Sequence, residues 1–143
     1  MQIVNFYASE NLETYSMKYV VIVAKFKDKW IFVRHFERNT WEIPGGHINE
    51  DEPIESAAKR ELYEETGALE FKLYPICIYS VRDDIKETFG YLYVANINKL
   101  GPLPNSEISE IKFVSDLPGN LTYPQIQPFL FHKANTLYKE MAV

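Results

Sequence analysis

The sequence predicts an α/β fold in which a mixed sheet lies between helices. Stretches rich in Val, Ile, Phe and Tyr occur in pairs separated by short polar turns, as in β-hairpins. Two other stretches have the start and stop residues or the length of helices. The order hairpin, strand, helix, strands and helix is typical of helices packed on a largely antiparallel or mixed sheet. We expect a single domain over residues 1–143, because this length supports one core.

The N-terminal third predicts an edge strand followed by a hairpin. Residues 2–7 are short and mixed, which suits an edge strand, and residues 8–16 are polar and expected to form a loop. Residues 18–26 are β-branched and almost continuously apolar, as in a strand that is buried on both faces. Residues 30–36 follow the polar turn at 27–29, so these two strands are predicted to pair.

A helix is predicted from Glu52 or Pro53 to Thr66, after a short extended piece at 41–44. Proline suits the first turn of a helix, where its missing N–H is not needed, and acids there favour the helix dipole. Gly67 is the expected C-terminal stop.

The rest of the chain predicts three strands and a last helix. The polar residues 82–87 form the expected turn between two of the strands, and the Gly- and Pro-containing residues 100–109 a loop. The strands are expected at 71–81, 88–97 and 111–114, and the helix at 123–139 with a break near Pro128.

Composition limits the class of function. A sequence pI near 5.2 argues against general nucleic-acid binding. Cys77 is the only cysteine, so no internal disulfide can form, and a cytoplasmic setting is expected. The first residues lack the features of a signal peptide, and no run approaches about 20 apolar residues, so we expect no membrane span.

The acidity of the protein is local. Residues 49–65 contain seven acids and two bases, a charge of 2 − 7 = −5, which equals the formal net charge of the whole chain. The remaining residues hold 13 acids and 13 bases. A cluster of carboxylates with no matching bases suggests a cation as partner.

The positions of the acids around the predicted helix suggest that some of them bind a metal ion. With Ile54 at 0° and an advance of about 100° per residue, Glu61 and Glu65 fall at about 340° and 20°. They lie among the apolar residues, with Glu64 beside them at about 280°. Buried ionised carboxylates are costly unless they are paired or bind metal, and Mg²⁺ or Mn²⁺ prefers such oxygens. On spacing alone a solvated acidic helix is favoured, because most charge runs are solvated.

The whole stretch resembles the Nudix box, a family motif with nine specified positions. The pattern is Gly, five residues, Glu, seven residues, Arg-Glu, aliphatic, any residue, Glu-Glu, any residue, Gly, aliphatic. These positions are occupied by Gly46, Glu52, Arg60, Glu61, Leu62, Glu64, Glu65, Gly67 and Ala68. Ala68 is smaller than the usual aliphatic residue. Residues 41–46 and 109–114 are similar to flanking segments of MutT-like members, and the resemblance implies a Nudix α/β/α sandwich.

The resemblance also implies hydrolysis of the pyrophosphate linkage in a nucleoside diphosphate derivative with Mg²⁺ or Mn²⁺. It implies metal ligation by Glu61, Glu64 and Glu65, with Gly45 contributing its carbonyl. Arg60 is expected to orient these carboxylates, and Glu52 to have a structural role. The extra acid from outside the box is expected to be Glu110, with Glu107 as the fallback, and either Glu61 or Glu110 is the general base.

Contacts to the substrate are expected upstream of the box and near the last helix. Arg34 resembles a substrate-contacting arginine of MutT-like members, although a surface arginine at a strand end is an equal alternative. His35 and His132 have no partners at metal-ligand spacing, which argues against zinc. The substrate-binding residues expected overall are Arg34, Arg38, Gly46, His47, Gln125 and Gln127.

Several substrates remain open. A MutT-like nucleoside triphosphate pyrophosphohydrolase, acting for example on oxidised purine nucleotides, is the first hypothesis. ADP-ribose or nucleotide sugars, and dinucleoside polyphosphates or capped RNA, are alternatives within the family. A non-catalytic domain that binds a nucleotide and regulates a partner belongs to a different class, and the intact box argues against it.

Overall fold

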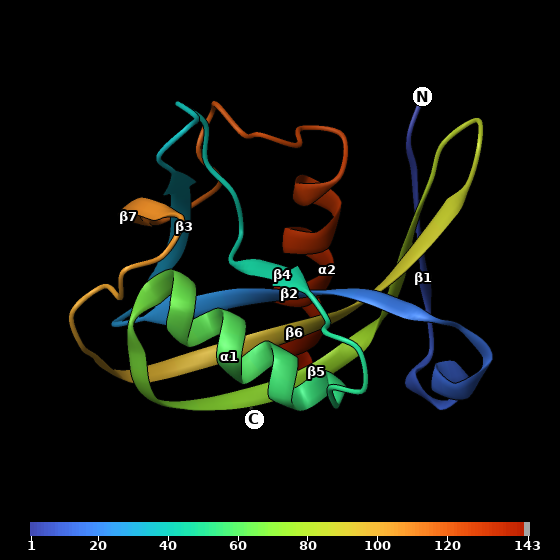
Figure 1. Cartoon of the computed structure of the whole chain (residues 1–143), viewed down its shortest axis with the longest axis horizontal. Helices are drawn as coiled ribbons and strands as arrows, with labels where there is room; N and C mark the ends of the chain where they lie inside the picture. Colours follow the sequence, from blue (N-terminus) through green and yellow to red (C-terminus); the bar gives the residue numbers. More distant parts are fainter. Residues whose placement is uncertain (142–143) are drawn as a thin grey trace.

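The computed structural model describes residues 1–141 and has a mixed seven-stranded sheet between two α-helices, which confirms the predicted fold class (Figure 1). The strand order is β1-β5-β6-β2-β3-β7, with the short β4 paired to β2. No helix in residues 1–141 is long and apolar enough to cross a membrane. The elements are β1 (Ile3–Tyr7), a 3-10 helix (Ser9–Thr14), β2 (Met17–Phe26), β3 (Lys29–His35), β4 (Gly45–His47), α1 (Ile54–Thr66), β5 (Ala68–Arg82), β6 (Glu87–Leu100), β7 (Ile108–Val114) and α2 (Gln127–Met141).

Strand β2 is the centre of the sheet and makes it mixed. It runs parallel to β6 and antiparallel to β3 and β4. The predicted β2–β3 hairpin is confirmed, and its turn has positive φ at Lys27 and Asp28, as tight two-residue hairpins require. Residues 20–24 are all buried, as expected for a strand covered on both faces.

Alternation along β2 divides the interior into two cores. Val20, Ile22 and Ala24 belong to the cluster that contains the apolar residues of α1. Val21 and Val23 belong to the cluster that contains the apolar residues of α2. The same alternation decides which residues of the neighbouring strands face α1, the helix that bears the acids.

Three predicted strands are longer than expected because pairing with neighbouring strands adds residues to them. Strand β7 begins at Ile108, within the expected loop, because it pairs with β3 as far as His35. Strands β5 and β6 extend beyond 71–81 and 88–97 because they pair with each other from Ala68 to Leu100.

Two local predictions also differ from the structure. Residues 9–14 form a 3-10 helix where a loop was expected. Helix α2 begins at Gln127, so Pro128 lies in its first turn, where no N–H donor is needed, and does not break the helix. The short extended piece expected at 41–44 agrees with the structure, where isolated β-bridges join Glu42 to Val33 and Trp41 to Leu121.

Gly67 ends α1 and directs the chain into β5. Its φ of 78° lies in the left-handed region, and its N–H donates to the Tyr63 carbonyl. A Cβ added here would meet the carbonyl oxygens of Gly101 and Pro102 at 2.8 Å. The position therefore requires glycine for both its conformation and its space.

We expect Gly67→Ala to lower the free energy of unfolding by roughly 2 kcal/mol, because the left-handed conformation alone costs an L-residue about 1–2 kcal/mol. Urea denaturation measures the change. Gly119→Ala is the control, since a Cβ there would have nothing within 4 Å. Equal stabilities of the two variants would contradict this account of the helix end.

Candidate active site

Helix α1 presents its carboxylates on the face that packs against the sheet. The side chains of Glu61 and Glu65 are only 12% and 9% exposed, whereas Glu64 at the margin is 43% exposed. This burial agrees with the predicted helical phase and differs from a solvated acidic helix. The buried residues Ala57, Ala58 and Leu62 lie on the same face and hold it against the sheet.

The two glycines of β4 allow the backbone to approach these acids closely. The Gly45 N–H donates to Glu65 Oε1 over 3.0 Å. A Cβ on Gly46 would overlap the carboxylate of Glu61, and one on Gly45 would overlap the backbone of β2. Any larger residue at these two positions would separate β4 from β2 or from α1.

Arg60 clamps the start of the acidic face. Its Nε and Nη2 donate to the two oxygens of Glu52 at 2.8 and 2.9 Å, and Nη1 donates to Glu61 at 2.7 Å. A further bond from Nη2 reaches the His47 carbonyl at 3.0 Å. The bonds from Arg60 and from the Asn49 N–H lower the pKa of Glu52 to about 2. Glu52 therefore anchors Arg60, and Arg60 orients Glu61.

Burial makes two carboxylates of the acidic face costly to ionise. It raises the pKa of Glu65 to about 8, opposed by the Gly45 N–H and assisted by the charges of Glu61, Glu42 and Glu107. Burial also raises the pKa of Glu61, against the bond from Arg60. Carboxylates this costly to ionise gain strongly from a bound cation.

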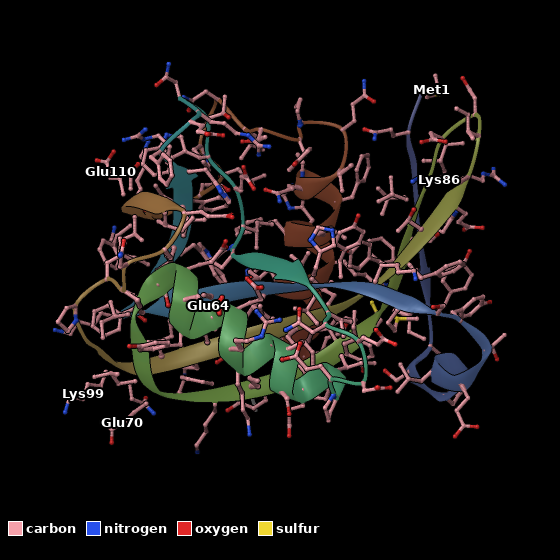
Figure 2. All side chains as sticks on the ribbon, viewed as in Figure 1. Met1, Glu64, Glu70, Lys86, Lys99 and Glu110 are labelled. Carbon is pink, nitrogen blue, oxygen red and sulfur yellow. The ribbon has the colours of Figure 1, made fainter. Side chains whose placement is uncertain are left out.

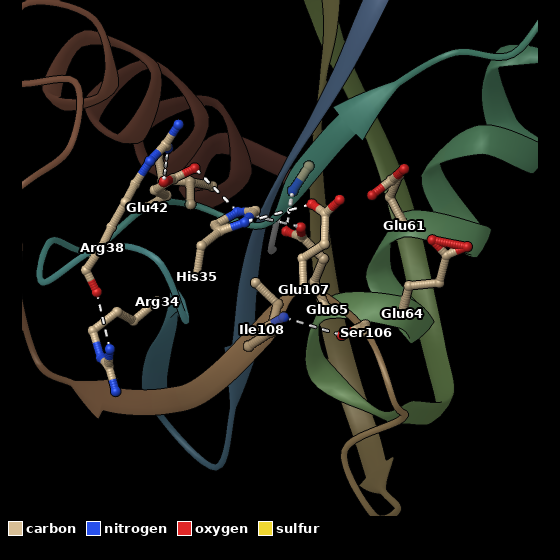
Figure 3. Close-up of polar contacts among 12 residues, drawn as sticks. Arg34, His35, Arg38, Glu42, Glu61, Glu64, Glu65, Ser106, Glu107 and Ile108 are labelled. Carbon is tan, nitrogen blue, oxygen red and sulfur yellow. Dashed lines mark hydrogen bonds and ion pairs between the residues drawn. The ribbon is translucent and has the colours of Figure 1, made fainter.

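His35 lies between three carboxylates that come from three different segments (Figure 3). Its Nε2 is 3.5 Å from Glu42 Oε1 and 3.7 Å from Glu65 Oε2. Its Nδ1, on the other edge of the ring, is 3.6 Å from Glu107 Oε2. Glu42 is also held by Arg38, whose Nη1 donates to it over 2.6 Å.

Sequence reasoning did not assign a role to His35 or Glu42; strand alternation carries a signal for His35, whereas only the structure places Glu42. His35 follows Ile31 and Val33 at intervals of two, and these two belong to the core under α1. Glu42 exchanges backbone hydrogen bonds with Val33, so both side chains lie on the same face of the sheet.

The structure does not bring Glu110 to the acidic face. Glu110 pairs with Arg34 across β3 and β7, with Nη2 3.2 Å from Oε1, and its side chain is 57% exposed. Figure 2 shows it away from Glu64 of α1. The fallback residue Glu107 lies near Glu61 and Glu65 instead (Figure 3). It lies in the loop just before β7, while Glu110 lies within the strand and faces Arg34.

A cleft of about 890 Å³ runs along the acidic face and beyond it. Arg38 and Tyr123 line it beyond Glu42, with the guanidinium carbon 5.9 Å from the centre of the tyrosine ring. Gln127 also lines it and is buried, accepting the Ile43 N–H through Oε1. The predicted residues that line this cleft are Arg38, Gly45, Gly46, His47, Glu61, Glu64, Glu65 and Gln127.

Four predicted site residues are not among those that line the cleft. Arg34 and Glu110 are occupied with each other, and Arg34 also donates to the Arg38 carbonyl. Gln125 is exposed in the turn before α2. Arg60 acts from behind the lining through its bonds to Glu61 and Glu52.

The donor set fits a hard divalent cation, although side chains must move to bind it. Within residues 1–141, no three His, Cys, Asp or Glu side chains are arranged to hold a metal as they stand. Glu61 is turned to Arg60 and Glu65 to the Gly45 N–H. Clustered carboxylates with raised pKa values have the oxygen donors that Mg²⁺ and Mn²⁺ take.

Comparison with known protein families gives a match to the NUDIX domain over residues 16–116. The chain belongs to the Nudix family. The match spans β2 to β7 and includes the whole acidic face. The resemblance read from the box is therefore confirmed.

Curated relatives of this Nudix domain match over part of their length. A Bacillus subtilis protein, whose name gives an unproven assignment as an 8-oxo-dGTP diphosphatase, is 38% identical over 85 residues, or 59% of this chain and 53% of that one. The RNA pyrophosphohydrolase of Haemophilus ducreyi is 43% identical over 47 residues, 33% of this chain and 24% of that one. This chain thus spans about half, or less, of these relatives.

Solved structures of Nudix proteins share the fold. The crystal structure of a Bacillus subtilis pyrophosphohydrolase superposes with a TM-score of 0.81 and 26% identity, covering 97% of this chain and 92% of that one. The Nudix domain of Shewanella oneidensis NrtR, complexed with ADP ribose, gives a TM-score of 0.67 at 19% identity, covering 91% and 97%.

The pKa of Glu65 predicts how the stability of the metal-free protein depends on pH. Folding raises this pKa from its ordinary 4.5 to about 8. The contribution of Glu65 to the stability of the fold is therefore fully present below pH 4.5 and is lost as the pH rises through 8. We expect the free energy of unfolding of Glu65→Gln, measured by urea denaturation at pH 9 in EDTA, to exceed that of wild type by at least about 1 kcal/mol. This is less than the full shift in the pKa of Glu65 implies. At pH 5 the advantage should shrink.

Glu55→Gln is the matched control, because Glu55 lies on the solvent-facing side of the same helix with 66% of its side chain exposed. Its effect on the unfolding free energy should stay within about 0.5 kcal/mol at both pH values. A Glu65→Gln variant that is less stable than wild type at pH 9 would show that the buried carboxylate is not costly.

Proposed function

We propose that this Nudix domain hydrolyses the pyrophosphate linkage of a nucleoside diphosphate derivative with the help of Mg²⁺ or Mn²⁺. One observation carries the proposal: the carboxylates of Glu61, Glu64, Glu65 and Glu107 line a single cleft large enough for a nucleotide. Two of them have raised pKa values, which is typical of functional sites. The names of the curated relatives point to the same reaction class.

The ligands we assign to the metal are Glu61, Glu64, Glu65 and Glu107, with the Gly45 carbonyl. When bound, the metal neutralises phosphate oxygens and lowers the pKa of a bound water. Arg60, fixed by Glu52, holds Glu61 in the cleft. Glu61 or Glu107 accepts the proton of the attacking water.

The rest of the cleft supports a nucleotide that lies with its phosphates at α1 and its base toward α2. His47 lies next to the glycines, where it can donate to a phosphate oxygen. Arg38, Tyr123 and Gln127 offer a cation, a ring and an amide to the base. We propose nucleoside triphosphates, oxidised purine nucleotides among them, as the first substrate class to test. The free Cys77 suits a reduced cytoplasmic setting.

A second candidate substrate is the triphosphate end of an RNA. The cleft continues past Tyr19 and His47 to Thr88 and Lys86 of the β5–β6 hairpin, so a chain attached to the nucleotide has room to leave. Some curated relatives are named RNA pyrophosphohydrolase. ADP-ribose and nucleotide sugars, dinucleoside polyphosphates, and binding without hydrolysis are the remaining alternatives.

A nucleotide panel tests the proposal. Release of phosphate or pyrophosphate is measured with Mg²⁺ or Mn²⁺ on nucleoside triphosphates, 8-oxo-dGTP, triphosphate RNA, ADP-ribose, a nucleotide sugar and a dinucleoside polyphosphate. Hydrolysis of one class identifies the substrate. Tight binding of a nucleotide without hydrolysis of any would favour a regulatory domain over an enzyme.

We expect Glu64→Gln to lower kcat by at least 100-fold, because it removes a charged metal ligand. Glu64 is partly exposed and makes only long contacts to Arg60, so the variant should remain folded. Circular dichroism and urea denaturation check the fold. A rate near that of wild type would refute the ligand assignment.

Glu107→Gln and Glu110→Gln separate the two candidates for the extra acid. Because Glu107 lines the cleft and Glu110 is paired with Arg34, we expect kcat to fall by at least 30-fold in the first and by less than threefold in the second. The reverse order of effects would restore Glu110 as the functional acid.

A further inference from the structure

His35 lies near three carboxylates, and two of them also have other hydrogen-bond partners. Glu42 accepts a 2.6 Å bond from Arg38, and Glu65 accepts the Gly45 N–H at 3.0 Å. In the part of the chain that the structure describes, the Glu107 side chain has no hydrogen bond, and its one neighbour at ion-pair distance is His35, with Nδ1 3.6 Å from Oε2. The position of Glu107 is therefore the one that depends on His35.

Glu107 needs such a partner because its surroundings oppose its position. Its side chain is 82% exposed, so water is freely available to it. Its charge raises the pKa of both Glu61 and Glu65, which means that the three carboxylates repel one another. Without an opposing attraction, a carboxylate in a loop turns toward solvent and away from its like-charged neighbours.

The backbone prepares the contact between His35 and Glu107. The N–H of Phe36 donates to the Glu107 carbonyl over 3.1 Å, and His35 pairs with Ile108 at the end of the β3–β7 ladder. A register shift between Arg34 and His35 lies at the same point. The backbones on either side of the pair are thus fixed, and only the side-chain contact is left to set the direction of the carboxylate.

We propose that His35 is a positioning residue that holds the Glu107 carboxylate over the acidic face of α1, so that Glu107 can act as a metal ligand. This inference rests on the proposed function. The imidazole suits the role because its two nitrogens lie on opposite edges of a rigid ring, Nδ1 toward Glu107 and Nε2 toward the gap between Glu42 and Glu65.

Two amide substitutions test which edge of the ring matters. In His35→Asn the amide nitrogen takes the place of Nδ1, and in His35→Gln it takes the place of Nε2. If His35 acts through Glu107, Asn keeps the function and Gln does not. If it acts through Glu42 or Glu65, the order is reversed and the proposal is overturned.

The first readout is Mn²⁺ affinity, measured without nucleotide from the spectrum of free Mn²⁺ by electron paramagnetic resonance. Removal of a group that orients a metal ligand typically lowers metal affinity or activity 10- to 100-fold. We expect His35→Ala and His35→Gln to weaken Mn²⁺ binding at least tenfold, and His35→Asn by less than threefold. His132→Ala, on the exposed side of α2, is the control and should bind Mn²⁺ as wild type does.

The second readout is coupling to Glu107. In the Glu107→Gln background, the addition of His35→Ala should change Mn²⁺ affinity and kcat by less than twofold, because the group through which His35 acts is already lost. Effects that multiply in the double variant would overturn the proposal, as would wild-type affinity in His35→Ala. A wild-type protein that binds no Mn²⁺ and hydrolyses no nucleotide would contradict the proposed function itself.

Discussion

The site depends on one costly arrangement, the burial of two glutamates on the apolar face of α1. Glu61 and Glu65 occupy positions where the helix packs against the sheet, and burial raises the pKa of both. The alanines and leucine beside them supply the packing that holds the helix in place. A fold optimised for stability alone would place apolar groups there, so the retained carboxylates mark the site as functional.

The surrounding residues each reduce part of the cost of burying these glutamates or orient the carboxylates. The glycines of β4 let a backbone N–H reach Glu65, where a side chain would hold the strand away. Arg60 donates to Glu61 through Nη1, while Glu52 accepts from its Nε and Nη2. Arg38 fixes Glu42, which assists in raising the pKa of Glu65. These contacts offset only part of the cost of burying the carboxylates at the cleft, and a divalent cation bound there can offset the rest.

The fold was predictable where the signal was local. The apolar run of β2 and the polar residues 27–29 after it made the hairpin predictable, and Gly67 marked the end of α1. The start of β7 was not predictable, because Ile108 joins the strand only through pairing with His35. The start of α2 was misplaced because the turn at Tyr123 resembles a helical turn, with the Gln127 N–H bonded to the Tyr123 carbonyl.

The sequence by itself determined the box, the helical phase that buries Glu61 and Glu65, and the family. These depend on spacings of three and four residues within one helix, which a helix converts directly into positions on one face. Only the tertiary structure decided that Glu107 and not Glu110 lies at the cleft, and that Arg34 pairs with Glu110 outside the cleft lining. The same holds for His35 between Glu42, Glu65 and Glu107. These residues are far apart in the chain, and they meet only through strand pairing and the packing of α1 on the sheet.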